Sequence, residues 1–402
     1  MIPLLAAIKS PTGRATLGLG VTQIVGWGTT FLMPSVLGRH VQDELGLPSE
    51  IVFAGITVMF GVGAVIAPRI GRVMDRIGAR LVMSLGSLVY AVALVALANS
   101  QGLASYLGSW ALLGIASALA LNTPSSIALV QVAGPRARQA IALLAILGGL
   151  ASTVFWPLTG ALDVALGWRG TLLVYAAVHL LLCAPVHFLV LPGRVVATAT
   201  TAGGAAPAPT GIEPEHRRRA FLLLAITLSF GAFVFTGAIV HMIEILRGLG
   251  YTTATAVLLA TMVGPAQVAI RLVELLFGHR YSIMNAAVFG SAALPLGLAL
   301  MLIAGDQFIA ALVGILCYGL ANGLKAVQRA TLPLALFGRS HFGAYMGRLA
   351  LPGGIVSASA PPLMAAILTN WGSMGALWIC FGFGTVSLGG MILLARLGKA
   401  IR

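Results

Sequence analysis

One charged stretch separates two long apolar runs of this sequence, and it reads Gly71-Arg72-Val73-Met74-Asp75-Arg76-Ile77-Gly78-Ala79-Arg80. Four of these ten residues are charged, although only 8% of the 402 residues in the chain are. Glycine permits a tight turn between two closely packed helices, and an aspartate pairs with a helix N-terminus or with a cation on a neighbouring helix. The stretch therefore predicts a short hairpin between two apolar helices, with Gly71 and Gly78 at the turn.

The composition excludes a water-soluble globular protein. Hydrophobic residues make up 59% of the chain and the mean hydropathy is +1.00, so water cannot solvate the surface that such a chain would present. A helix needs about 20 apolar residues to cross a bilayer, and the repeated apolar runs predict roughly twelve such helices. We therefore predict an all-α polytopic membrane protein whose twelve transmembrane helices form two pseudo-symmetric six-helix bundles.

The apolar runs fall into two groups of six. They lie at about 15–38, 50–70, 81–99, 104–130, 139–162 and 170–191, and then at about 220–243, 252–277, 283–304, 308–336, 342–369 and 373–396. The segment between the groups is rich in Ala, Thr, Gly and Pro and ends in three arginines, a composition typical of a flexible cytoplasmic linker. The predicted domains are an N-terminal bundle over 1–192, a linker over 193–219 and a C-terminal bundle over 220–402.

The distribution of positive charge orients the chain in the membrane. With a cytoplasmic N-terminus and twelve spans, 18 of the 24 lysines and arginines lie on the cytoplasmic side, and only Arg39, Arg169 and Arg247 lie outside. This pattern explains the net charge of +14 without a nucleic-acid partner and places both termini in the cytoplasm. The short loops contain no N-x-S/T acceptor, which favours a bacterial inner membrane.

The two halves of the chain are related in sequence. At an offset of 200 residues the matching positions are Gly78 and Gly278, Arg80 and Arg280, and Asn122 and Asn322; at an offset of 205 they are Gly148-Gly149 and Gly353-Gly354, and Pro157 and Pro362. The second copy of the charged stretch has changed, because Arg271 replaces its first glycine and Leu275 replaces its aspartate. This repetition predicts that the two bundles arose by duplication.

The charged stretch, written G-x-x-x-D-R-x-G-x-R, resembles the loop between the second and third spans of the major facilitator superfamily of secondary transporters. The residues that match are Gly71, Asp75, Arg76, Gly78 and Arg80. The resemblance implies alternating access, with a substrate site between the two halves near the middle of the membrane. It also implies a gating role for this stretch, in which Asp75 pairs with a cation at the start of the eleventh span, such as Arg348.

Three cations lie inside apolar runs, namely Arg271, Lys325 and Arg329. Each costs roughly 2.5–3.5 kcal/mol at the centre of a span, so a function or a partner must offset the cost. We interpret Arg271 and Lys325 as an anion site, in which Arg271 binds a carboxylate with two parallel hydrogen bonds and Lys325 adds a second charge. The alternative for Arg271 is a structural ion pair, for which Glu274 is one turn away, and Arg329 is near enough to the membrane face to snorkel.

A narrower resemblance concerns the eighth span. The run Gly264-Pro265-Ala266-Gln267-Val268-Ala269-Ile270-Arg271 looks like the corresponding segment of monocarboxylate porters, in which an acid four residues before an arginine accompanies carboxylate binding and proton coupling. Gln267 stands where that acid would be, which argues against the same proton relay. The combination of an intramembrane arginine and lysine also resembles the oxalate–formate exchangers, although Lys325 is in the tenth span rather than the eleventh.

Other polar residues in apolar runs are candidates for lining a substrate site. They are Gln23, Trp27, Asn122, Gln267, Asn322 and His241, although each is individually more typical of a helix-to-helix contact. Glu274 and His241 are the candidates for proton coupling. The three cysteines, Cys183, Cys317 and Cys380, lie singly in separate runs and predict neither a disulfide framework nor a metal site.

These observations predict a secondary active transporter of small, monocarboxylate-like organic anions that works by proton symport or anion exchange. The alternative is a proton-driven exporter of amphipathic drugs or other toxic compounds. We find no nucleophile–base pair, metal-ligand spacing or phosphate loop that would indicate an enzyme. We also find no soluble sensory domain that would indicate a receptor. We expect a monomer in the lipid bilayer, with a small molecule as its substrate, no cofactor and no metal.

Overall fold

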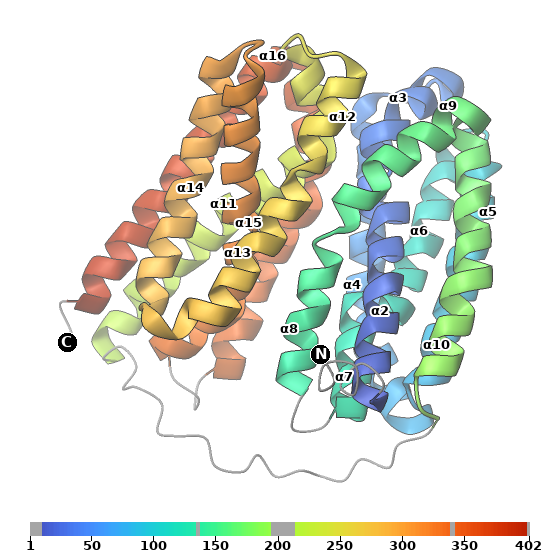
Figure 1. Cartoon of the computed structure of the whole chain (residues 1–402), viewed down its shortest axis with the longest axis horizontal. Helices are drawn as coiled ribbons and strands as arrows, with labels where there is room; N and C mark the ends of the chain where they lie inside the picture. The colour runs from blue at the N-terminus through green and yellow to red at the C-terminus, as the bar shows by residue number, and fades with distance from the viewer. Residues whose placement is uncertain (1–9, 134–136, 194–213, 338–341, 400–402) are drawn as a thin grey trace. The chain divides into compact units, whose positions relative to one another are not determined.

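The computed structural model describes residues 10–133, 137–193, 214–337 and 342–399, and every regular element in these ranges is helical. The chain divides into two compact units, Met1–Thr201 and Ala202–Arg402. The predicted linker falls largely on residues 194–213, which lie outside the described ranges. The predicted all-α membrane fold is confirmed, and each unit is best understood by itself (Figure 1).

The N-terminal unit consists of α2 (Pro11–Trp27), η1 (Gly28–Leu32), α3 (Pro34–Leu45), α4 (Ser49–Ile77), α5 (Ala79–Ala98), α6 (Leu103–Ala120), α7 (Asn122–Ala133), α8 (Ala137–Gly148), α9 (Ala151–Val178), η3 (His179–Cys183) and α10 (Ala184–Val190). The C-terminal unit consists of η4 (Pro214–His216), α11 (Arg217–Gly248), α12 (Thr253–Thr261), α13 (Val263–Phe277), η5 (Gly278–Arg280), α14 (Ile283–Ala304), α15 (Phe308–Phe337) and α16 (Phe342–Lys399).

Two prolines explain the irregular turns in the N-terminal unit. The π-helical segments η1 and η3 end two residues before Pro34 and Pro185. Proline has no backbone N–H and its ring clashes with the carbonyl group four residues earlier, which in both cases belongs to the π-helical segment. The first and sixth spans are therefore continuous helical runs with a widened turn inside them.

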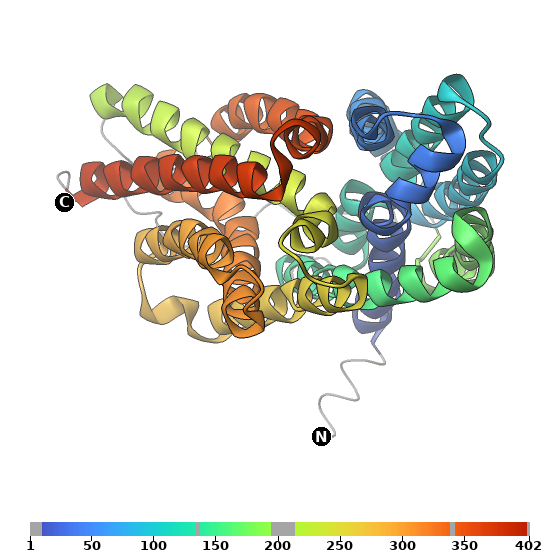
Figure 2. The ribbon, with the colours of Figure 1, turned by 90° about the horizontal axis from the view of Figure 1, so that it is seen from above.

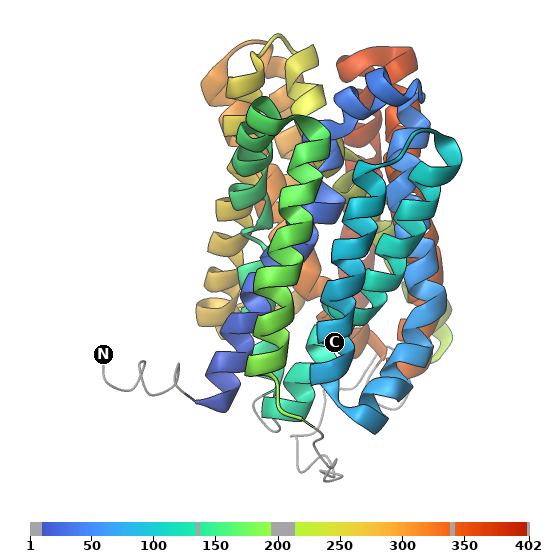
Figure 3. The ribbon, with the colours of Figure 1, turned by 90° about the vertical axis from the view of Figure 1, so that its right-hand side faces the viewer.

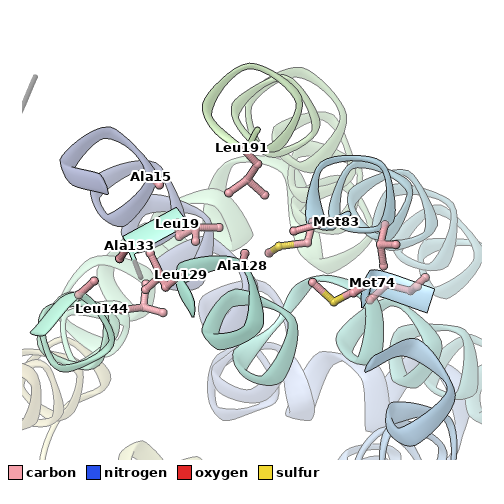
Figure 4. Packing of buried hydrophobic residues seen from close by; sticks show 13 residues of the cluster. Ala15, Leu19, Met74, Met83, Ala128, Leu129, Ala133, Leu144 and Leu191 are labelled. Carbon is pink, nitrogen blue, oxygen red and sulfur yellow. The ribbon is translucent and has the colours of Figure 1, made fainter. Parts of the chain in front are cut away.

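Small and flexible apolar residues build the core of the N-terminal unit. The cluster shown in Figure 4 joins Ala15 and Leu19 of α2 to Met83 of α5, Leu129 of α7 and Leu191, all of them at most 8% exposed. Because lipid is as apolar as these side chains, close van der Waals packing rather than exclusion of water holds such helices together. In this unit α5 packs along both α9 and α10 (Figure 3).

The C-terminal unit is built on two long helix pairs, α11 with α16 and α14 with α15. Helices α14 and α15 approach closely at Gly297 and Gly314, where an added Cβ on either residue would lie 2.6–2.7 Å from the carbonyl oxygen of the other. Only glycine permits that approach. The long run α16 is interrupted at Gly372, and Figure 2 shows its two parts as separate red helices.

The duplication seen in the sequence has a structural counterpart. Gly167 in α9 has φ 69° and ψ 174°, and Gly372 in α16 has φ 64° and ψ −175°. This region of backbone space is accessible essentially only to glycine. The two positions differ by the same offset of 205 residues that relates Pro157 to Pro362, so the turns they form are equivalent in the two halves.

Nine helical segments among the described residues are long and apolar enough to cross a membrane. Two of them, Gln139–Val190 and Pro352–Leu397, have 52 and 46 residues, about twice the length of one span, and they contain the breaks at Gly167 and Gly372. Large apolar side chains are exposed along them, for example Leu181 at 74% and Trp371 at 65%. Lipid accommodates such a surface and water does not. The count of twelve spans stays a prediction.

Candidate functional site

The charged stretch of the sequence is mostly helical. Helix α4 continues to Ile77, so Gly71 lies inside the helix rather than at the turn, and the turn itself is formed by Gly78. Gly78 has φ 86° and ψ 162°, and its N–H donates to the carbonyl oxygen of Met74 at 2.9 Å. Gln131 of α7 also donates to that oxygen, at 3.3 Å. The end of α4 is therefore held by one bond from the turn and one from a neighbouring helix.

The last residue of the stretch secures the end of another span. Arg80 donates from Nε to the carbonyl oxygen of Leu191 at 2.6 Å, and its guanidinium lies 5.4 Å from the ring centre of Phe188. Leu191 is the residue after α10, where helix carbonyl groups have no partner within the helix. Arg76 is exposed, whereas the side chains of Asp75 and Arg348 lie outside the described part of the chain. The gating pair stays a prediction.

The second copy of the stretch has a different turn. Gly278 has φ −57° and ψ −21° and begins a short 3₁₀ helix, in contrast to the positive φ of Gly78. Glu274 accepts a hydrogen bond of 2.8 Å from the hydroxyl of Tyr281. Burial and this carboxylate raise the pKa of Tyr281 to about 12, so the hydroxyl keeps its proton at physiological pH. The described contact of Glu274 thus ties the end of α13 to the following turn.

Arg271 links α13 to α15. Its Nε donates to the carbonyl oxygen of Gly323 at 3.5 Å, and its Nη2 donates to Oε1 of Gln267 at 3.3 Å. Gln267 is itself 7% exposed. The neutral amide of Gln267 and the charged guanidinium of Arg271 thus form a pair one turn apart on α13. The eighth span of monocarboxylate porters has an acid and an arginine at the matching places.

The C-terminal unit contains a cavity of about 260 Å³. Three polar side chains of α15 lie along it, Asn322, Lys325 and Arg329, and the other described lining residues are Leu228, Ala232, Phe235, Thr236, Ala326, Leu349, Gly353 and Ser357. No carboxylate is among these described residues. The cavity therefore has two cations one turn apart on one wall and hydroxyl and apolar groups on the others, which suits a small anion with an apolar part.

Lys325 reaches across this region to α11 and α16. Its Nζ lies 3.4 Å from the carbonyl oxygen of Thr227 and 3.4 Å from the hydroxyl of Ser387, which itself donates to Thr227 at 2.8 Å. The ammonium group also lies 5.1 Å from the ring centre of Phe235, within the range of a cation–π contact. The described partners of this ammonium are thus neutral.

The remaining predicted residues are divided between the two units. Gln23 of α2 is 1% exposed and donates to Oγ of Ser125 at 2.8 Å, so it joins α2 to α7. Trp27 stacks edge-on against Phe31 at 5.7 Å, and Asn122, the first residue of α7, is exposed. Of these three residues, Gln23 is the one whose described hydrogen bond joins two helices of the N-terminal unit.

In the C-terminal unit, His241 of α11 is 2% exposed and its Nε2 lies 3.0 Å from the carbonyl oxygen of Pro361. Asn322 and Lys325 share the cavity on α15, and Arg271 and Gln267 lie together on α13. Within this unit the structure therefore brings the predicted residues together as two pairs. Among the described residues, no group of three or more histidine, cysteine or acidic side chains is arranged to hold a metal ion.

Two polar clusters of the N-terminal unit are not predicted by the sequence. His179 and His187 are 2% and 1% exposed and contact serine and threonine hydroxyls of other spans. Glu44 accepts hydrogen bonds from Trp168 and Arg169 at 2.5 and 2.7 Å. The only signal in the sequence was two histidines eight residues apart in an apolar run, because their partners are distant in the chain.

Comparison with known proteins identifies the architecture. The sequence model of the Major Facilitator Superfamily matches residues 18–328. No curated protein sequence matches significantly. Similar solved structures include the nucleoside transporter NupG (TM-score 0.70, 15% identity, 97% of this chain and 99% of that chain) and a bacterial homolog of the human lysosomal transporter Spinster in an inward-facing, unoccupied conformation (TM-score 0.69, 14%, 98% and 99%). Another is the human organic anion transporter MFSD10, or TETRAN (TM-score 0.64, 18%, 96% and 100%).

Proposed function

Because this chain belongs to the Major Facilitator Superfamily, whose members are transporters of small molecules, we propose that it is a secondary transporter of small organic anions. Monocarboxylates are the substrate class that we favour. The chain is a multi-pass membrane protein, and alternating access between its two halves is the mechanism that this fold supports. No step of such transport requires a cofactor.

One observation carries the choice of an anion. Lys325 and Arg329 line the same cavity, and no carboxylate is among the described residues around it. Two cations with no counter-charge among the described residues are costly in an apolar environment, and a bound carboxylate offsets that cost by charge-assisted hydrogen bonds. The volume of about 260 Å³ fits a small acid better than a large conjugate. Lys325, Arg329 and Asn322 are therefore the proposed anion-binding residues.

Arg271 and Gln267 are a second element of the proposed site. An arginine presents a planar pair of donors to a carboxylate, and Gln267 holds this one from a position one turn away. Because an amide does not titrate, Gln267 does not supply the proton relay that an acid supplies at the matching place in monocarboxylate porters. Of the remaining predicted residues, Gln23, Trp27 and His241 enter the proposal as packing residues of their own units, and the exposed Asn122 is given no role in it.

Two further features support the proposal. One structural neighbour is an organic anion transporter by its description, although at 18% identity that likeness shows the fold alone. The excess of lysine and arginine in the predicted cytoplasmic loops supports an orientation with both termini in the cytoplasm of a bacterial cell. We propose a monomer in the inner membrane.

The alternative is an exporter of amphipathic compounds. The apolar residues Leu228, Phe235 and Leu349 in the cavity favour it, because a drug-sized molecule binds chiefly through such contacts. The two functions differ in their use of the cations. An exporter of cationic dyes gains nothing from Lys325 and Arg329, which repel its substrate.

Counterflow in proteoliposomes tests the proposal. Vesicles are loaded with an unlabelled acid from a panel of pyruvate, lactate, formate and oxalate, and exchange with the labelled acid is measured with and without a pH gradient. The proposal predicts exchange of at least one of these acids above the level of protein-free vesicles. Exchange of a cationic dye together with no exchange of any acid would establish the alternative.

A further inference from the structure

His187 lies where a helix end favours a positive charge. It occupies the last turn of α10, three residues before that helix ends at Val190, and its side chain is 1% exposed. The unpaired carbonyl groups at a helix C-terminus stabilise a nearby cation. The ring packs between α2 and α5, so the histidine connects the first, third and sixth spans of the N-terminal unit.

Both ring nitrogens of His187 face oxygen atoms. Nδ1 lies 3.1 Å from the carbonyl oxygen of Met83 and 2.9 Å from Oγ of Ser87, and Nε2 lies 2.9 Å from Oγ1 of Thr22. A carbonyl oxygen only accepts, so the contact with Met83 is a hydrogen bond when Nδ1 carries a hydrogen. The hydroxyl of Thr22 donates to the carbonyl oxygen of Leu19 at 3.1 Å, which leaves its oxygen to accept from Nε2. This arrangement satisfies both N–H groups of a protonated ring.

The same site accommodates the neutral ring. When Nε2 loses its hydrogen, rotation of the Thr22 hydroxyl lets that group donate to Nε2 instead of to Leu19, and Nδ1–H still donates to Met83. No side chain has to move and no nitrogen loses its partner. Because burying an unpaired polar group is costly, a site that pairs both states is suited to binding and releasing a proton.

His179, eight residues earlier in the same helical run, has a different environment from His187. Its Nε2 lies 2.9 Å from Oγ1 of Thr29, whose hydroxyl donates to the carbonyl oxygen of Val25 at 2.9 Å. Its Nδ1 is buried without a hydrogen-bond partner among the described residues, and its ring stacks on Tyr90 at 4.5 Å. A proton on that nitrogen would have no acceptor in the described part of the chain. His179 is therefore a matched histidine that stays neutral.

The surroundings of His187 favour reversible binding. The titratable and charged groups on the described elements that pack against α10 are Arg14 of α2, Arg80 and Tyr90 of α5, and His179 and Cys183 of η3. No carboxylate is among them, and Arg80 is the nearby cation, bonded to Leu191 at 2.6 Å. Without an acid partner the ring does not hold its proton permanently.

We propose that His187, with Thr22, Ser87 and the carbonyl group of Met83, forms a proton-binding site, and that the carrier exchanges this proton with solution as it transports its anion. Binding adds one proton to the neutral imidazole and gives imidazolium, and release reverses this step. The coupling part rests on the proposed function. It places proton coupling in the sixth span rather than at Glu274 or His241.

The proton site is tested without any substrate. Hydrogen–deuterium exchange at the C2 atom of each histidine, measured by mass spectrometry on the full-length protein in detergent, reports the titration of each ring. We expect His187 to titrate at a higher pH than His179, because both of its N–H groups have acceptors when the ring is protonated. Thr22→Val removes the acceptor of Nε2–H and is expected to lower the pH at which His187 titrates. A His187 that does not titrate in the wild type overturns the proposal.

Coupling is tested in proteoliposomes with labelled pyruvate or lactate. A gradient of one pH unit supports about tenfold accumulation for one proton per anion, because one unit corresponds to about 1.4 kcal/mol. His187→Gln is expected to lose this accumulation and to keep counterflow, whereas His179→Gln keeps both; Thr22→Val serves if His187→Gln does not fold. Full gradient-driven accumulation by His187→Gln overturns the proposal. A wild type that exchanges no acid while His187 titrates contradicts the proposed substrate instead.

Discussion

The ammonium group of Lys325 lies against the α-carbon of Gly231, so closely that a Cβ at position 231 would be 1.2 Å from Nζ. Gly231 is on α11 and Lys325 is on α15, so the absence of one side chain makes room for the charged end of another. A lysine buried among apolar helices needs such a notch to reach the oxygen atoms of Thr227 and Ser387. The space at Gly231 therefore determines where the ammonium group of Lys325 lies in the proposed anion site.

Gly231→Ala is expected to displace Lys325 and weaken the binding of a carboxylate. Losing one hydrogen bond to a charged group costs about 1.5–3 kcal/mol, which corresponds to at least a tenfold rise in the KM of carboxylate counterflow. Gly389→Ala is the control, because a Cβ at that position meets no atom within 4 Å. An unchanged KM in a folded Gly231→Ala protein contradicts this role of the notch.

The two glycines of the charged stretch are expected to respond differently to alanine. Gly78 has a backbone conformation that only glycine readily adopts, so Gly78→Ala costs about 1–3 kcal/mol of stability. Gly71 lies inside α4, and its added Cβ would meet its nearest atom at 3.9 Å, so Gly71→Ala is neutral or stabilises the helix by about 0.5–1 kcal/mol. Thermal unfolding of both variants in detergent is the measurement. Equal losses would show that the turn is not centred on Gly78.

The cluster around Glu44 predicts a specific pH dependence. Hydrogen bonds from Arg169 and Trp168 hold the pKa of Glu44 below its usual value. A lowered folded pKa contributes stability that is fully present above the unfolded pKa of about 4.3 and is lost as the pH falls through the folded value. We expect wild-type thermal stability to fall more steeply than that of Glu44→Gln below about pH 4. Parallel curves for the two proteins would count against the prediction.

Arg271→Lys separates binding from packing. A lysine cannot make both the bond to Gly323 and the bond to Gln267, and it presents no planar pair of donors to a carboxylate. We expect at least a tenfold loss of carboxylate counterflow, estimated from one charged hydrogen bond. Thermal unfolding is measured on the same sample, because a loss of stability with full counterflow would assign Arg271 to helix packing alone.

The sequence was sufficient for the membrane fold, because hydropathy and the length of the apolar runs follow directly from composition. The spacing of four residues between Lys325 and Arg329 is likewise enough to put them on one face of a helix. The sequence misplaced Gly71 at the turn, because the charges after Ile70 do not end a helix and α4 continues to Ile77. Local patterns report contacts only between residues that are near in the chain.

The contacts that define the sites lie beyond the reach of such patterns. His187 and Thr22 are 165 residues apart, and the partners of Lys325 come from α11 and α16. A histidine in an apolar run has the same appearance whether one or both of its nitrogens find an acceptor. The distinction between His179 and His187 therefore required the structure.

The most direct test of the anion site is carboxylate counterflow by the wild type and by Lys325→Gln at equal amounts of folded protein. Arg396→Gln is the control, because it removes an exposed cation from the same unit outside the cavity. We predict exchange of a small carboxylate by the wild type and by Arg396→Gln, and at least a tenfold loss in Lys325→Gln, as expected for one charged hydrogen bond. Exchange by Lys325→Gln at the wild-type rate and KM would show that the anion binds elsewhere.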